Sequence, residues 1–140
     1  MKKLLFAIFT IATLSIAFSS CKKYEEGPTI SLASKKSRLC GDWKLEQYLY
    51  NGTDQTALIA AVVGSNFVWG IEKDGTYTQA GNFSDAGTWK LGEDKDDVTF
   101  TSNATGATAD TYRILKLKIK ALWFKQTQAN GDVAEFHLSQ

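Results

Sequence analysis

The sequence predicts an all-β domain, an eight-stranded antiparallel up-and-down barrel with one short helix. Short segments with a hydrophobic residue at every second position follow one another from Gly41 onward, and such alternation is typical of half-buried strands. Turn-forming pairs separate several of them, namely Asn51-Gly52, Asp74-Gly75 and Asn130-Gly131. We expect closure into a barrel because it removes the exposed edges of a sheet; an open sandwich is the alternative.

The start of the domain combines a strand with a helix. Residues 41–50 alternate, with Trp43, Leu45 and Leu49 on the face that is expected to point inward. Residues 53–63 have helical spacing and are followed by a glycine, which favours the end of a helix. Because this segment is strongly apolar, a buried strand is the alternative for it.

The middle of the domain is predicted to form a hairpin and two further strands. Residues 66–77 alternate on both sides of an Asp-Gly pair, which is among the strongest short-range hairpin signals. Residues 88–91 and 98–101 are the next predicted strands. The small and polar residues of 81–87 and 102–109 predict loops.

The last part of the chain, from residue 112 onward, carries the strongest alternation. Ile114 and Leu115 are adjacent, so the inward face must change there and a bulge is expected. The predicted inward set is then Leu115, Leu117 and Ile119, and the predicted water-facing set is Lys116, Lys118 and Lys120. Residues 122–124 and a final strand that contains Phe136 and Leu138 complete the eight strands.

The first 20 residues match a cleaved export signal. Lys2 and Lys3 precede the apolar segment 4–18. That segment is short for a permanent span, because a transmembrane helix needs about 20 apolar residues. Two small residues, Ser19 and Ser20, complete the secretory pattern.

Cys21 directly follows these small residues and resembles the modified cysteine of a bacterial lipoprotein lipobox. Phe18 and Ser20 depart from the commonest form and are similar to the looser form of Bacteroides-group lipoproteins. The resemblance implies that Cys21 becomes the new N-terminus and carries a diacylglyceride and a palmitate. Two acyl chains suffice for stable anchoring in a membrane. An ordinary cleaved signal with a chance cysteine is the alternative.

The resulting organisation has three parts. Residues 1–20 are the signal, 21–38 a flexible tether without periodicity, and 39–140 the folded domain. The expected location is the cell envelope, on the outer membrane, with the domain either periplasmic or surface-exposed.

Charge and cysteine content narrow the possible partners. The chain from Cys21 onward has 14 basic and 15 acidic residues, which excludes nucleic acid or an anionic membrane surface as the main partner. With Cys21 acylated, Cys40 has no internal disulfide partner, so the fold must depend on its hydrophobic core. We expect Cys40 to be buried and inert.

Several motifs of the domain recur in a known order. They are Gly41-x-Trp43-x-Leu45, Asn51-Gly52, Lys73-Asp74-Gly75-Thr76-Tyr77, Gly87-Thr88-Trp89-Lys90-Leu91 and Asn130-Gly131 with Phe136. Their order and spacing over residues 39–138 resemble the lipocalin-like domains of Bacteroides-group lipoproteins. The resemblance implies a lipocalin-shaped barrel without a defined ligand or activity. The chain lacks the cysteine pair that such domains often carry in their middle loops.

Alternation places large apolar side chains inside the predicted barrel. The candidate ligand-binding residues are Trp43, Leu45, Phe67, Trp69, Tyr77, Trp89, Phe100 and Trp123. An eight-stranded barrel is either just filled by its side chains or holds one small ligand. We favour a filled interior, and the helix predicted in 53–63 would close one mouth in either case.

The sequence offers no catalytic constellation. His137, the one histidine, is predicted to be a solvated outward residue beside Glu135. The chain has neither a Gly-x-Ser-x-Gly turn nor a glycine-rich phosphate loop, and Cys40 with His137 cannot supply a zinc ligand set. The acidic segment 93–97 lacks calcium-loop spacing and is predicted to be a solvated turn. We therefore expect no catalytic residues, metal or cofactor.

The leading hypothesis is a non-enzymatic lipoprotein, attached to the membrane through Cys21, with a small apolar or amphipathic ligand in the barrel. The alternative is a filled barrel that presents its outer face to a cell-envelope protein or a glycan. Tyr48, Tyr50 and Phe124, which we expect to be exposed, motivate that alternative.

Overall fold

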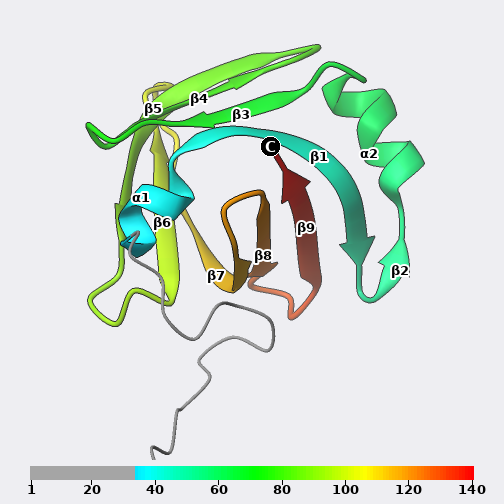
Figure 1. Cartoon of the computed structure of the whole chain (residues 1–140). Coiled ribbons are helices and arrows are strands. Elements are labelled where there is room, and N and C mark those ends of the chain that lie inside the picture. Colours follow the sequence, from blue (N-terminus) through cyan, green and yellow to red (C-terminus); the bar gives the residue numbers. More distant parts are fainter. Residues whose placement is uncertain (1–33) are drawn as a thin grey trace, which may run out of the picture.

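The structure, a computed structural model, describes residues 34–140 (Figure 1). The predicted signal segment, Cys21 and residues 22–33 of the predicted tether lie outside the described residues. The described chain forms α1 (Lys35–Leu39), β1 (Gly41–Tyr50), β2 (Thr53–Asp54), α2 (Thr56–Val63), β3 (Val68–Ile71), β4 (Thr76–Ala80), β5 (Ser84–Leu91), β6 (Asp97–Ser102), β7 (Ala109–Leu117), β8 (Ala121–Thr127) and β9 (Val133–Ser139).

The strands form a single antiparallel sheet that closes on itself. Strands β3 to β9 each pair with the next strand along the chain, and β1 pairs with both β3 and β9. Eight strands, β1 and β3–β9, therefore make a closed up-and-down barrel, which confirms the predicted fold class and not the sandwich alternative. The two-residue β2 only extends the end of β1, across the Asn51-Gly52 turn.

The helices define the two ends of the barrel. Helix α1 lies where β1 begins and α2 lies where β1 ends, on opposite sides of the molecule in Figure 1. Helix α2 confirms the helix predicted in 53–63, whereas α1 was not predicted. Its residues 35–38 had been assigned to the tether, because five residues are too few to show a helical period.

Strand β5 begins earlier than predicted, at Ser84 inside the expected loop 81–87. Asp85 and Gly87 occupy its inward positions, so this half of the strand lacks the hydrophobic alternation on which the prediction relied. A Cβ atom at Gly87 would lie 2.0 Å from the Thr101 carbonyl oxygen, so the close approach of β5 and β6 requires glycine there.

A bulge in β1 redirects its second half. The pairing of β1 with β9 shifts at Glu46, so the prediction that Leu49 faces inward is wrong. Tyr48 and Tyr50 point into the barrel instead, and the Tyr48 ring lies 4.9 Å from that of inward Phe136. A single extra residue thus places two tyrosines inside the α2 end of the barrel.

A second bulge lies in β7, where the prediction expected it. The pairing of β7 with β8 shifts between Ile114 and Lys116. Ile119 is not inward as predicted, because β7 ends at Leu117 and Ile119 lies exposed in the following turn. The predicted row of three lysines is broken for the same reason, since only Lys116 belongs to the strand.

Four aromatic rings fill the centre of the barrel. Trp69, Phe100, Tyr112 and Phe124 come from β3, β6, β7 and β8, and their ring centroids lie 4.8 to 6.0 Å apart. These distances and tilted or edge-to-face angles are those that aromatic pairs prefer. Phe124 is fully buried, so the prediction that it is exposed is wrong. Tyr48 and Tyr50 are half-buried rather than exposed.

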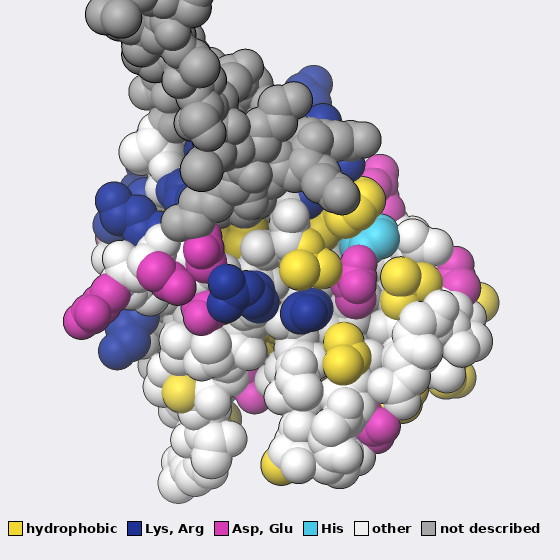
Figure 2. Space-filling view, turned by 90° about the horizontal axis from the view of Figure 1, so that it is seen from below, with side chains coloured by type: hydrophobic (Ala, Val, Ile, Leu, Met, Phe, Trp, Pro, Cys, Tyr) yellow, Lys and Arg dark blue, Asp and Glu magenta, His cyan; other side chains and the backbone are white. Residues whose placement is uncertain are grey.

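The outer face of β7–β9 carries a stack of side chains. Trp123 lies parallel to His137 at 3.9 Å between ring centroids, and the Lys116 ammonium lies 4.0 Å above the other side of the Trp123 ring. His137 also contacts Glu135, at 2.6 Å between Nε2 and Oε1. In Figure 2 the cyan histidine lies between acidic and hydrophobic side chains. His137 therefore faces outward as predicted, but it is only 9% exposed, so the prediction that it is solvated is wrong.

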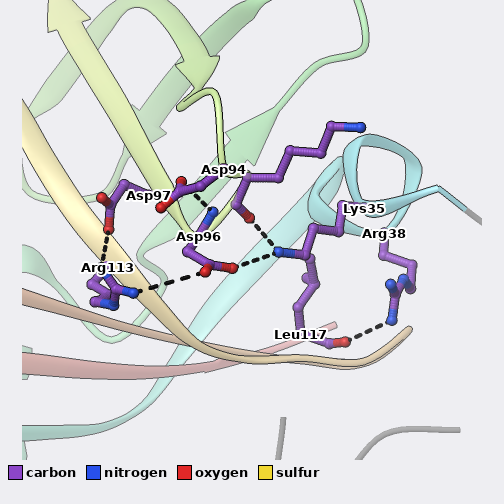
Figure 3. Close-up of polar contacts among 8 residues, drawn as sticks. Lys35, Arg38, Asp94, Asp96, Asp97, Arg113 and Leu117 are labelled. Carbon is purple, nitrogen blue, oxygen red and sulfur yellow. Dashed lines mark hydrogen bonds and ion pairs between the residues drawn. The ribbon is translucent and has the colours of Figure 1, made fainter. Parts of the chain in front are cut away.

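Helix α1 closes its end of the barrel through polar contacts to the β5–β6 turn and to β7 (Figure 3). The Lys35 ammonium donates to the Asp96 carboxylate at 2.9 Å and to the Lys95 carbonyl, and Arg38 donates to the Leu117 carbonyl at 3.1 Å. Segment 93–97 is the predicted turn with residues 93–95 exposed, whereas Asp96 is bonded and half-buried, which the prediction did not include.

The core at the α1 end contains two indole groups, and both are satisfied, whereas the Nε of Arg38 on the covering helix is buried without a partner. Trp43 Nε1 donates to the Leu39 carbonyl at 2.9 Å, and Trp89 Nε1 donates to the Glu72 carbonyl at 2.8 Å. The two hydrogen bonds offset the cost of removing the indole N–H groups from water.

Replacing one of the four central rings tests this packing. We expect Phe100→Ala to lower the free energy of unfolding by about 3–5 kcal/mol, because it leaves a cavity that the surrounding rings cannot fill. The neighbouring Thr101→Ala, on the exposed side of the same strand, should change it by less than about 0.5 kcal/mol. Urea unfolding of both variants measures the difference, and equal effects would contradict the assignment of the core.

Candidate functional site at the α2 end of the barrel

Seven of the eight candidate ligand-binding residues lie inside the barrel. Trp43, Phe67, Trp69, Tyr77, Trp89 and Phe100 are buried in the core cluster, and half-buried Leu45 packs against it. The eighth, Trp123, was predicted wrongly. Its neighbours Leu122 and Phe124 are the inward residues of β8, so Trp123 belongs to the outer stack. In three consecutive hydrophobic residues, alternation alone cannot tell which faces inward.

The candidate site lies where β1 separates from β3. The two strands pair only from Gly41 to Lys44 on the β1 side, after which β1 continues beside β9. Helix α2 connects the end of β1 to the start of β3 and lies beside β1 along this separation. The separation and the helix together form a pocket at the α2 end.

Side chains next to α2 fix its first turn. The Asp54 carboxylate accepts hydrogen bonds from the Thr56 backbone N–H at 2.9 Å, from the Thr56 hydroxyl at 2.6 Å and from the Gln47 amide at 2.9 Å. These bonds, first those from Thr56 and then that from Gln47, lower the pKa of Asp54 to about 2. The Thr56 hydroxyl in turn accepts from the Tyr48 backbone N–H at 2.9 Å, which ties the helix to the inward face of β1.

The last turn of α2 is held from the β4–β5 connection. Asn82 donates from its backbone N–H to the Val63 carbonyl at 2.7 Å and from its side chain to two further carbonyls of the last turn, each at 3.3 Å. Such bonds satisfy carbonyl groups that a helix end leaves without partners. Both ends of α2 are therefore bonded to the barrel.

The pocket between α2, β1 and β3 has a volume of about 390 Å³. Its lining residues are Lys44, Leu45, Thr56, Ala60, Gly64, Ser65, Asn66, Phe67 and Val68. Leu45 and Phe67 are two of the predicted ligand-binding residues, and they form its inner, apolar wall. The polar groups of the pocket lie mainly on the segment that joins α2 to β3.

Inward polar side chains distinguish the α2 half of the barrel from the apolar α1 half. Asp85 accepts from the Tyr77 hydroxyl and from the Ser102 hydroxyl, each at 2.6 Å. Asp110 accepts from the Gln126 side chain at 2.9 Å. Burial opposes ionisation of Asp85, but the bonds from Ser102 and Tyr77 outweigh it, so the pKa of Asp85 lies below its ordinary value.

One polar group in the barrel centre is buried without a hydrogen bond. Trp69 is 3% exposed, and its Nε1 has no acceptor. The ring of Tyr112, a residue that is 9% exposed, packs edge-on against Trp69 at 5.7 Å between ring centroids. Burial raises the pKa of Tyr112, and the charge of Asp110 raises it further. An unsatisfied buried donor is costly, so Trp69 Nε1 marks a place where an added acceptor would gain a hydrogen bond.

A second hollow opens beside these groups. It has a volume of about 510 Å³ and lies between the start of β7 and the end of β8, where inward Asp110 and Gln126 form part of its wall. Its remaining walls are polar or small, so it extends the polar mouth of the barrel rather than its apolar interior.

The sequence prediction missed the further interior residues of this barrel half, which are Tyr48, Asp85, Asp110, Tyr112 and Gln126. For Asp110 and Gln126 a signal existed, because each lies two residues from a buried aromatic residue of its strand. For Tyr48 there was none, because the bulge at Glu46 changes the face.

Metal ligands, membrane-spanning helices and the free thiol are the remaining features of the described chain that bear on function. Among residues 34–140 no group of three or more His, Cys, Asp and Glu side chains could hold a metal ion. In the same part of the chain no helix is long and apolar enough to cross a membrane. Cys40 is a half-buried free thiol at the α1 end, and burial raises its pKa. A raised pKa favours the protonated thiol, and the prediction that Cys40 is fully buried is wrong.

These features describe a closed eight-stranded barrel of lipocalin-like architecture, with an apolar core at one end and an amphipathic pocket at the other. Neither a scan against protein-family models nor a search of curated proteins finds a match for this chain.

The lowered pKa of Asp85 predicts a pH dependence of stability. A carboxylate whose pKa is lowered by folding stabilises the fold above its unfolded pKa of about 3.9, and this contribution is lost as the pH falls through the folded value. The unfolding free energy of wild type minus that of Asp85→Asn should therefore shrink from about pH 6 to about pH 2. Urea unfolding across this range measures it. A difference that stays constant or grows towards acid would contradict the bonding of Asp85.

Proposed function

We propose that the protein is a non-enzymatic, lipocalin-like lipoprotein that is attached to the outer membrane through Cys21 and binds a small amphipathic molecule at the α2 end of its barrel. The observation that carries the proposal is the pocket of about 390 Å³, which has an apolar wall of Leu45 and Phe67 and polar groups on the segment that joins α2 to β3. Ligand sites of proteins are typically clefts of about 300–1,000 Å³ with apolar walls and a few placed polar groups.

The packing decides where such a ligand lies. The four central rings occupy the middle of the barrel, so the ligand does not extend through it as in a hollow barrel. An apolar tail fits between α2 and the wall of Leu45 and Phe67, and a polar head fits beside Ser65 and Asn66 of the same pocket. An acceptor on the ligand that reached Trp69 Nε1 would add to the affinity.

Attachment rests on the sequence of the first 21 residues. A basic start, an apolar segment too short to span, and small residues before Cys21 support export and acylation. Acyl chains at Cys21 hold a protein on a membrane because each buried CH₂ contributes about 0.8 kcal/mol.

Filling the pocket tests the ligand role. Ala60 lines the pocket, whereas Ala57 of the same helix is exposed and does not. Ala60→Phe should weaken binding at least about tenfold, or about 1.4 kcal/mol, while Ala57→Phe should leave it unchanged. Intrinsic tryptophan fluorescence, titrated with fatty acids, sterols, haem and alkylammonium amphiphiles, measures the affinity. Absence of any response to the whole panel would contradict the proposal.

Replacing Cys21 tests attachment. In a bacterial host with an outer membrane, the full chain should incorporate labelled palmitate and sediment with membranes. Cys21→Ala should lose both, whereas Cys40→Ala should keep both because Cys40 lies inside the folded domain. Labelling that persists in Cys21→Ala would contradict the assignment.

A cell-surface interaction module is the second candidate function, and a different observation now favours it. Leu58 and Val62 lie on one face of α2 and are 64% and 57% exposed, and Phe83, next to the Asn82 that bonds α2, is exposed as well. Exposed apolar patches of this kind mark interaction sites. If Ala57→Phe disturbs function and Ala60→Phe does not, this module rather than the pocket is the functional part.

A further inference from the structure

We propose that the outward side of α2, together with Phe83 of the β4–β5 connection, docks on the surface of a neutral or zwitterionic lipid bilayer. The inference rests on the proposed function, because the bilayer is the one that holds Cys21 and the docked face brings the pocket to it. It follows from an apolar helix that the barrel covers on one side only, from a surface without charges, and from the size of the apolar patch.

Helix α2 is apolar on all its sides, yet only one side is covered. Residues 57–63 are all apolar. The inward side contains Ile59 and Val63, which pack on the core, and Ala60, which lines the pocket. The outward side is exposed and consists of Ala57, Leu58, Ala61 and Val62. A helix that is hydrophobic all round is normally buried, so this outward side calls for a covering surface.

Large exposed hydrophobic side chains gather at the same place. Residues 34–140 contain four of them, and three form the docking face, namely Leu58, Val62 and Phe83, with exposed fractions of 64%, 57% and 44%. Asn82 bonds carbonyls of the last turn of α2, so the chain that carries Phe83 is held beside the helix. The fourth, Ile119, lies in the β7–β8 turn at the α1 end.

The surface around the docking face lacks charged residues. Residues 55–71 and 75–84, which include α2, β3 and β4, contain no Asp, Glu, Lys or Arg, although 22% of the whole chain is charged. The charged residues that border these segments are of both signs, and they are Asp54, Asp85 and Lys44. A partner that is recognised by its charge finds no countercharge here. A neutral or zwitterionic bilayer matches this surface, because the contact is made by apolar side chains.

The size of the docking face favours a bilayer over a protein partner. Its three large side chains expose roughly 300 Å² together, since the area of such a side chain is about 150–250 Å². A standard protein interface buries about 800 Å² on each partner, so this face alone does not hold a second copy or a soluble protein. A small contact suffices for a domain that is already attached to the membrane, because attachment gives the face a high effective concentration near the bilayer.

The length of the chain before the described residues allows this orientation. Residues 22–33 separate Cys21 from Ser34 at the start of α1, and a segment of this length spans up to about 40 Å. Helices α1 and α2 lie on opposite sides of the molecule (Figure 1). A domain of about 100 residues has a radius of gyration of only about 13 Å, so the α2 end can reach the bilayer that holds Cys21.

Docking through α2 gives the pocket access to its ligand. Ala60 lines the pocket from the inward side of the same helix whose outward side contacts the bilayer. Ser65 and Asn66, which follow α2 and line the pocket, are exposed beside that contact. An amphipathic molecule therefore passes from the lipid headgroups into the pocket along the end of α2, and its apolar tail does not cross bulk water.

Labels at two matched positions test the inference. The full chain with Cys40→Ala is acylated in a bacterial host, reconstituted into phosphatidylcholine vesicles and labelled with a fluorophore through Val62→Cys or, as the control, through Ile119→Cys. Ile119 is an exposed hydrophobic residue like Val62, but it lies at the α1 end. Nitroxide lipids should quench the label of Val62→Cys at least about threefold more strongly, because an interfacial helix buries its apolar face about 5–10 Å into the headgroup and acyl boundary.

A pair of charge variants locates the contact. In the labelled Val62→Cys protein, Leu58→Asp places a carboxylate on the docking face and should remove most of the quenching. Ile119→Asp makes the same change at a residue that is 69% exposed and should leave the quenching intact. Both side chains are exposed, so urea unfolding of the two variants should match that of the parent protein.

The outcomes separate this inference from the proposed function. If the protein floats with the vesicles, attachment stands, and quenching that is no stronger at Val62→Cys than at Ile119→Cys, or that survives Leu58→Asp, overturns the bilayer contact. A label that becomes protected only as the protein density on the vesicles rises identifies a second copy as the occupant and overturns it as well. If the protein does not float with the vesicles, the proposed attachment fails together with the inference.

Discussion

The structure depends on one strand, β1, which pairs with β3 over its first four residues and with β9 over the rest. This double pairing closes the barrel and removes its edges. It also forces β1 and β3 apart after Lys44, and α2 occupies the separation. The double pairing of β1 therefore both closes the barrel and creates the pocket between β1 and β3.

The barrel divides its interior between stability and recognition. At the α1 end, Trp43 and Trp89 are buried with satisfied indole groups, and α1 covers them through Lys35 and Arg38. At the α2 end, the same inward positions carry carboxylates, hydroxyls and an amide, and Trp69 Nε1 lacks an acceptor. Burying unsatisfied polar groups costs stability, so Trp69 Nε1 at the centre of the barrel calls for a functional explanation.

The sequence predicted the features that depend on nearby residues of the chain and missed those that depend on distant residues. Alternation and the turn pairs predicted the barrel, α2 and seven of the eight interior residues, because each depends on neighbours along the chain. The bulge at Glu46, the outward face of Trp123 and the docking of α1 depend on partners far along the chain, on β9 and on Asp96. The polar half of the site was missed because inward Asp85 and Asp110 interrupt the hydrophobic pattern that served as the signal.

The most direct test of the central claim, that a ligand binds at the α2 end, uses the indole N–H resonances of the four tryptophans in a ¹⁵N-labelled full chain with Cys21→Ala. Trp43 and Trp89 donate to backbone carbonyls at the α1 end, whereas Trp69 Nε1 has no acceptor. On addition of an amphiphile that binds in the fluorescence titration, the account predicts that the Trp69 resonance shifts while those of Trp43 and Trp89 stay in place. A shift confined to Trp43 or Trp89, or to the outer-face Trp123, would contradict it.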